Sequence, residues 1–117
     1  MKKLLALMLS FGVALGAAAQ TVAASFPGGK AAEQEYITKN LQYPPMAKEN
    51  GVEGVVTVIF SVKPDGSIGN IKIKRMVDPD LEQESIRLVK NMPKWQPATD
   101  NGTPVESSAT VDVTFTL

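Results

Sequence analysis

The chain has 117 residues, no cysteine and no histidine, and its twelve Lys and Arg residues balance its twelve Asp and Glu residues. This length allows one domain. The missing His and Cys remove thiol chemistry, the usual general base and the commonest metal ligand. No basic surplus is available to attract nucleic acid. The composition therefore predicts a protein that is not an enzyme, with no metal, no cofactor and no nucleic-acid partner.

The N-terminal residues 1–19 are predicted to be a cleaved secretory signal peptide. Met1-Lys2-Lys3 is a short basic start, the segment from Leu4 to Ala19 is uncharged and mostly apolar, and Ala17-Ala18-Ala19 offers the small residues that a signal peptidase requires. Cleavage is expected near Ala19/Gln20. The alternative is an uncleaved anchor in the inner membrane, although polar residues begin at Gln20, short of the roughly 20 apolar residues that a spanning helix needs.

Residues 20–30 are interpreted as a short flexible lead, and residues 31–117 as the folded domain. Apolar residues at loose helical spacing predict a helix over Ala31–Gln42, which must end before Tyr43-Pro44 because a residue that precedes Pro leaves the helical region. Pro45 begins a further helical turn, and Gly51 closes it.

The second half of the chain predicts strands, a hairpin and one long helix. Gly54–Val62 alternates as a strand, Lys63-Pro64-Asp65-Gly66 forms the turn, and Ile68–Val77 returns. A helix over Leu81 to about Met92 presents one apolar stripe and ends at Pro93. Asn101-Gly102 is a turn, and the last strand runs from about Val105 to Leu117. The predicted fold class is α+β, a two-layer sandwich of a three-stranded antiparallel sheet packed against two helices.

Three features are open to more than one interpretation. The acidic run Asp78, Asp80, Glu82 and Glu84 is explained better by a helix N-terminus, which favours acidic residues, than by a cation site. Trp95 is expected to pack in the core rather than to form a ligand platform. Tyr43 is either a packing anchor or part of a groove.

The two outer strands of the predicted sheet differ in how well they are protected from pairing with another chain. Ile68–Val77 carries Lys72, Lys74 and Arg75, whereas the last strand carries only Asp112 among threonines. Gly54–Val62 has apolar residues on both faces, which suggests that it lies in the middle; the last strand is then an edge with little protection. This arrangement suits the addition of a partner peptide as a further strand. The alternatives are that the edge pairs with a second copy in a homodimer, or that residues 20–30 cover it.

From Phe26 to Leu117 the chain resembles the C-terminal domain of TonB. The resemblance depends on the order of these segments: Phe26-Pro27-Gly28-Gly29, Asn40-Leu41-Gln42-Tyr43-Pro44, Ala47, Gly51, Gly54, the alternation Val56/Val58/Phe60/Val62, Asp65-Gly66, Asp80-Leu81, Met92-Pro93-Lys94-Trp95 and Phe115-Thr116-Leu117. The segments Phe26-Pro27-Gly28-Gly29 and Met92-Pro93-Lys94-Trp95 are similar to the version of the domain found in Bacteroidetes-type bacteria.

The resemblance implies a periplasmic domain that binds the short TonB-box peptide of outer-membrane transporters by β-strand addition and does no chemistry. It also implies which residues contact the peptide. The implied partner-binding residues are Asn40, Leu41, Gln42, Tyr43, Thr110, Val111, Asp112, Val113, Thr114, Phe115 and Thr116. Because the lead is short and the N-terminus is predicted to be cleaved, we expect a stand-alone, exported domain. The alternative is an exported structural or regulatory module that uses the same edge to dimerise or to bind another periplasmic protein.

Overall fold

A sheet of three antiparallel strands forms the centre of the fold in the computed structural model, which describes residues 20–117. The strand order is β3 (Ile68–Arg75), β2 (Gly54–Val62) and β6 (Ser107–Phe115). The prediction that the doubly apolar strand lies in the middle and the last strand at an edge is confirmed. The predicted signal peptide, residues 1–19, lies outside the described residues.

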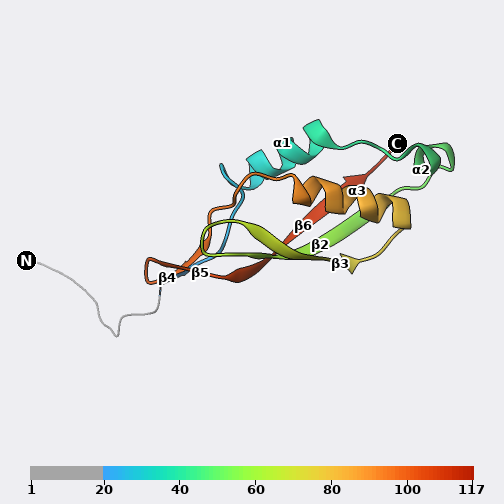
Figure 1. The fold of residues 1–117 in the computed structure, drawn as a ribbon. Helices are drawn as coiled ribbons and strands as arrows, with labels where there is room; N and C mark the ends of the chain where they lie inside the picture. The colour runs from blue at the N-terminus through green and yellow to red at the C-terminus, as the bar shows by residue number, and fades with distance from the viewer. Residues whose placement is uncertain (1–19) are drawn as a thin grey trace, which may run out of the picture.

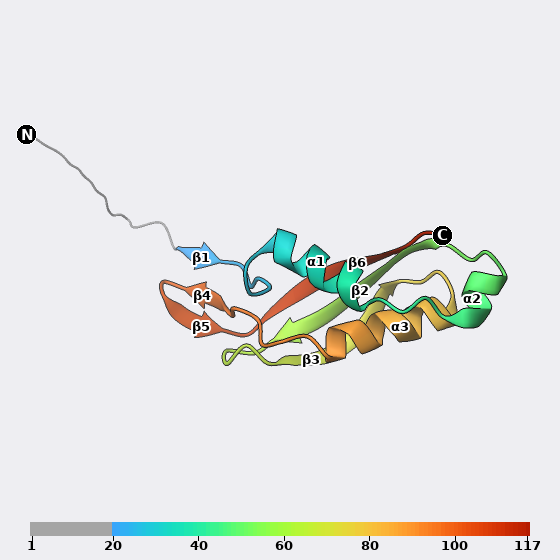
Figure 2. The same ribbon diagram turned by 90° about the horizontal axis from the view of Figure 1, so that it is seen from above.

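Helices cover one face of this sheet, and the predicted α+β sandwich is confirmed. Figure 1 shows α1 (Lys30–Asn40) and α3 (Pro79–Lys90) above the strands, with the short α2 (Pro45–Glu49) at one end. In the view from above, α1 lies alongside β6 (Figure 2). The sheet therefore has one face that carries helices, and its β6 edge has a helix beside it.

The helix boundaries differ from the predicted ones by one or two residues. Helix α1 ends at Asn40 rather than Gln42, because Leu41 is already extended, with φ −64° and ψ 130°. Helix α3 begins at Pro79, because the carboxylate of Asp78 accepts hydrogen bonds from the backbone N–H groups of Asp80 and Leu81 at 3.0 and 3.3 Å. The interpretation of the acidic run as a helix start is therefore correct, with Asp78 as the capping residue.

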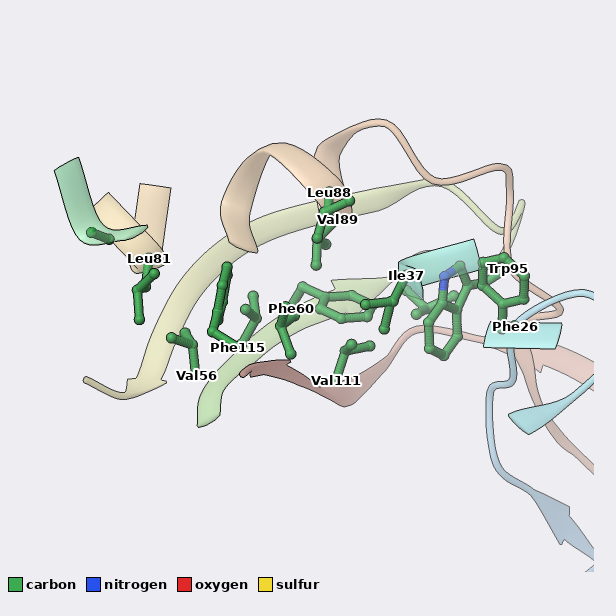
Figure 3. Packing of buried hydrophobic residues seen from close by; sticks show 14 residues of the cluster. Phe26, Ile37, Val56, Phe60, Leu81, Leu88, Val89, Trp95, Val111 and Phe115 are labelled. Carbon is green, nitrogen blue, oxygen red and sulfur yellow. The ribbon is translucent and has the colours of Figure 1, made fainter. Parts of the chain in front are cut away.

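The core lies between the sheet and the helices, and Phe60 is at its centre (Figure 3). Its fully buried apolar residues from β2, β6 and α3 are Val56, Val58, Phe60, Val62, Val111, Val113, Phe115, Leu81, Leu88 and Val89. Trp95 is 5% exposed and packs edge-on against Phe60 and Phe26, with ring centroids 5.1 and 6.1 Å apart. The prediction of Trp95 as a core residue is confirmed.

A second, smaller sheet was not predicted, and it corrects the interpretation of the lead. It consists of β1 (Thr21–Val22), β4 (Ala98–Asp100) and β5 (Thr103–Val105), in the order β1–β4–β5. The description of residues 20–30 as a short flexible lead is therefore wrong, because this segment pairs with β4, forms a bridge from Ser25 to Gln96 and buries Phe26. The strands were missed because they are two or three residues long and mostly exposed.

The turn and strand ends around this small sheet also differ from expectation. Asn101 and Gly102 both have positive φ, at 52° and 85°, which a tight two-residue hairpin turn requires. The predicted turn is thus the hairpin between β4 and β5. Because that hairpin uses residues up to Val105, the last strand β6 begins at Ser107 and not at Val105.

Candidate functional site

One outer edge of the main sheet is formed by β6. All nine residues of β6 pair with β2 in unbroken register, from Gly54 opposite Phe115 to Val62 opposite Ser107. Among residues 20–117, β6 has no second strand partner. The single charge of the strand does not guard the edge, because Asp112 accepts a hydrogen bond from the Thr57 hydroxyl of the neighbouring strand at 2.7 Å.

The opposite edge, β3, is protected against pairing with another chain. Lys72, Lys74 and Arg75 are exposed along it. The register against β2 shifts twice, between Thr57 and Val58 and between Ile59 and Ser61. Such bulges and charges disrupt the regular array of donors and acceptors that a further strand needs. The two edges therefore differ, and only β6 offers a regular one.

A groove of about 310 Å³ lies between α1 and the end of β6. We call it the α1–β6 groove, and it is lined by Gln34, Ile37, Thr38, Leu41, Thr114 and Thr116. The helix residues share one face because they recur at intervals of three or four positions. Gln34 and Thr38 were not predicted as site residues. Their spacing relative to Ile37 and Leu41 places them on the same face of the helix, but the prediction of that face considered only apolar residues.

A second hollow, of about 360 Å³, lies beside the beginning of β6. We call it the Trp95 pocket, and its lining residues are Ala23, Ala24, Ser25, Phe26, Lys30, Glu33, Trp95, Ser108, Ala109 and Thr110. Glu33 is buried, and its carboxylate accepts from Lys30 Nζ at 3.0 Å. The lead thus forms part of a wall next to the free edge.

A pair of charged residues on α3 fixes the segment between α1 and α2. Glu84 accepts the backbone N–H of Gln42 at 2.7 Å and two hydrogen bonds from Arg87, also at 2.7 Å. Arg87 Nη2 donates in turn to the carbonyl of Asn40 at 2.9 Å. We call this arrangement the Glu84–Arg87 clamp. It sets the direction in which the chain leaves α1, and so places Leu41 at the α1–β6 groove.

Electrostatics keep the clamp ionised. Burial raises the pKa of Glu84, but the hydrogen bonds from Arg87 and from the Gln42 amide outweigh it and hold that pKa below its ordinary value. The hydrogen bond to Glu84 raises the pKa of Arg87. Neither residue was predicted to act in this way, although an acidic and a basic residue three positions apart on a helix are a recognisable pair.

The predicted binding residues divide between two sides of the molecule. Leu41, Thr114 and Thr116 meet in the α1–β6 groove, and Thr110 lies at the Trp95 pocket. Val111, Val113 and Phe115 point into the core, so that only their backbone is available at the edge. Asn40 is held by the clamp. Gln42 and Tyr43 instead line a separate hollow of about 600 Å³ between α2 and α3.

Tyr43 acts as a packing anchor. Its ring packs edge-on against Phe115 with centroids 5.5 Å apart, and its hydroxyl donates to the Val52 carbonyl. In residues 20–117 no three potential ligating side chains gather into a metal site. Within the same range no helix combines the length and the apolar character needed to cross a membrane.

Comparison with known proteins agrees with this fold. The structure defines an α+β domain with a free, helix-flanked sheet edge, and its overall fold is similar to two solution structures of the C-terminal domain of Helicobacter pylori TonB. Each is 23% identical to this chain; the alignments have TM-scores of 0.55 and 0.56 and cover 72% and 74% of this chain and 76% and 90% of the other. Curated protein sequences give no match.

The sequence profile of the family described as Gram-negative bacterial TonB protein C-terminal matches residues 39–117. The chain therefore belongs to the TonB C-terminal family, which is not enzymatic. The family resemblance and the fold class predicted from the sequence are confirmed.

Proposed function

We propose that this domain binds the TonB-box peptide of an outer-membrane transporter by adding it to β6 as a fourth strand. The observation that carries the proposal is the regular edge of β6 along nine residues, beside the α1–β6 groove, with a single charge that is bonded to the neighbouring strand. Strand addition gains affinity from backbone hydrogen bonds and specificity from pockets for alternate side chains. Membership of a family that generally binds TonB boxes supports this choice of peptide.

The proposal also covers the cellular location of the protein and the process in which it takes part. An exported domain, released near Ala19/Gln20, would meet transporter peptides in the periplasm, where it would take part in energy-coupled transport across the outer membrane. The basic start, the apolar segment and the small residues at positions 17–19 support export.

An NMR titration with synthetic TonB-box peptides from the same genome tests the proposal. We expect chemical-shift changes concentrated in Thr110–Thr116 and at Leu41. Thr114→Lys places a charge at the edge and should weaken binding about tenfold, a typical effect of a guarding charge at an edge strand. Thr103→Lys makes the same substitution at an exposed position of β5, outside the α1–β6 groove and the Trp95 pocket, and is the matched control. Changes centred on β3, or equal effects of the two variants, would refute the proposed edge.

The same edge also suits a homodimer, since two copies of a regular strand can pair with each other. Sedimentation of the free protein distinguishes the two uses. A monomer that binds peptide supports strand addition by a transporter, whereas a dimer that ignores peptide supports the structural alternative.

A further inference from the structure

The Trp95 pocket and the α1–β6 groove follow each other along the same helix and the same strand. Lys30 and Glu33 in the first turn of α1 line the pocket, and the groove begins at the next residue, Gln34. Along β6, residues 108–110 line the pocket, and Thr114 and Thr116 line the groove. A strand added to β6 would therefore pass both hollows.

The two hollows differ in their chemistry. The pocket has aromatic walls from Phe26 and Trp95, with the small Ala24 and Ala109 beside them. Its charged lining residues, Lys30 and Glu33, are already paired at 3.0 Å. Such a pocket favours an uncharged, large apolar or aromatic side chain, because aromatic pairs add to the gain from burial.

The groove favours a smaller apolar side chain. Its apolar lining comes from Ile37 and Leu41, and its remaining residues are Gln34 and threonines. A branched aliphatic side chain would cover the two apolar residues while the polar ones stay hydrated at the margin.

The spacing of the two hollows sets a register. Thr110 and Thr114, the nearest lining residues of the two, are four positions apart, or about 13 Å along a strand. Side chains four positions apart in a strand point to the same face, whereas those three or five apart point to opposite faces. We propose that this domain selects peptides with two apolar side chains at positions i and i+4, one in each hollow.

This inference rests on the proposed strand addition and goes beyond it by defining the peptide. The pocket is built largely by residues 23–33, which precede the part of the chain that matches the family profile, residues 39–117. The preference for a large side chain in the Trp95 pocket is therefore expected to depend on the lead of this chain.

Binding of designed peptides tests the register. The probes are Ser/Thr-rich peptides of about ten residues that carry one Phe and one Val. They are made with the pair four apart in both orders, with the pair three or five apart, and with Phe alone. We expect one of the two four-apart peptides to bind about tenfold more tightly than the other probes. The preferred order identifies the direction of the added strand. NOE contacts are expected between its Phe ring and the methyl groups of Ala24 and Ala109.

Filling the pocket provides the matched test. Ala24→Trp should remove the advantage of the four-apart peptide, whereas Ala31→Trp, an exposed site on α1 outside the pocket, should keep it. Ala23→Trp, an exposed lining position, serves if Ala24→Trp does not fold. Peptides that shift β6 resonances with affinities independent of spacing would overturn the two-hollow register alone. No β6 shift with any of these peptides or with TonB-box peptides would overturn the proposed strand addition as well.

Discussion

Among the glycines of residues 20–117, Gly66 leaves the least space for a side chain. It has φ +89° in the turn between β2 and β3, and a Cβ atom there would overlap the carbonyl oxygen of Trp95. The same contact is supported by a hydrogen bond from the Trp95 N–H to the Gly66 carbonyl at 2.9 Å. The turn thus holds the loop that carries the only tryptophan.

Gly66→Ala is expected to lower the free energy of unfolding by at least about 2 kcal/mol, because it adds a backbone clash to the strain of a positive φ. Gly102→Ala is the matched control: its φ is +85°, but the space around it is open. That variant should cost about 1 kcal/mol. Urea unfolding followed by Trp fluorescence measures both. Equal costs would show that the contact with Trp95 contributes nothing.

At the scale of elements, the Glu84–Arg87 clamp joins α3 to the connection between α1 and α2. Since the folded-state pKa of Glu84 lies below its unfolded value, the ionised carboxylate stabilises the fold above the unfolded pKa. That stabilisation is lost as the pH falls through the lower, folded pKa. The clamp should therefore weaken in acid.

Glu84→Gln should cost about 1–2 kcal/mol at neutral pH, because the charge-assisted hydrogen bonds from Arg87 become neutral ones. Between about pH 7 and pH 3 the stability of this variant should fall less than that of the parent. Glu35→Gln, exposed on α1, is the control and should follow the parent. Chemical denaturation at several pH values makes the comparison, and parallel pH curves for parent and Glu84→Gln would contradict it.

The sequence predicted those elements whose side-chain pattern is long and regular. Gly54–Val62 was located to the residue because four inward apolar residues alternate up to a Pro-Asp-Gly turn. The β1–β4 pair carries no such pattern. Thr21 pairs with Asp100, which is far away in the sequence, and both residues are exposed. The bulges in β3 depend on packing against β2 rather than on any local signal, apart from Asn70, which has φ 49°.

The strand edge of the candidate site could be predicted from the sequence, but the side chains that line the hollows beside it could not. The edge position of β6 followed from the apolar residues on both faces of Gly54–Val62, which place that strand in the middle, and its weak protection followed from the contrast between Asp112 and the three basic residues of β3. The walls required tertiary structure, because Glu33, Trp95 and Ala109 come together from three distant parts of the chain. Gln42 and Tyr43 were expected beside β6. They line the hollow between α2 and α3 instead, because the Glu84–Arg87 clamp turns the chain after Leu41.

At the scale of the whole molecule, Trp95 connects the small sheet to the main core. Its ring contacts Phe60 on one side and Phe26 of the lead on the other (Figure 3). Phe26 also packs against Tyr36 of α1, with ring centroids 5.5 Å apart. The lead, the helical layer and the sheet are thus packed through one aromatic cluster, and we expect them to unfold together.

Phe26→Ala tests this cooperativity. Truncating a buried Phe costs about 3–5 kcal/mol, and Phe26 is 6% exposed. Val22→Ala, at a lead residue that is 60% exposed, should cost less than about 0.5 kcal/mol. Unfolding is followed by Trp95 fluorescence and by far-UV circular dichroism. Coincident midpoints, both lowered by Phe26→Ala, indicate one cooperative unit. A fluorescence midpoint that falls while the dichroism midpoint stays would mean that the lead opens by itself and that the Trp95 pocket exists only part of the time.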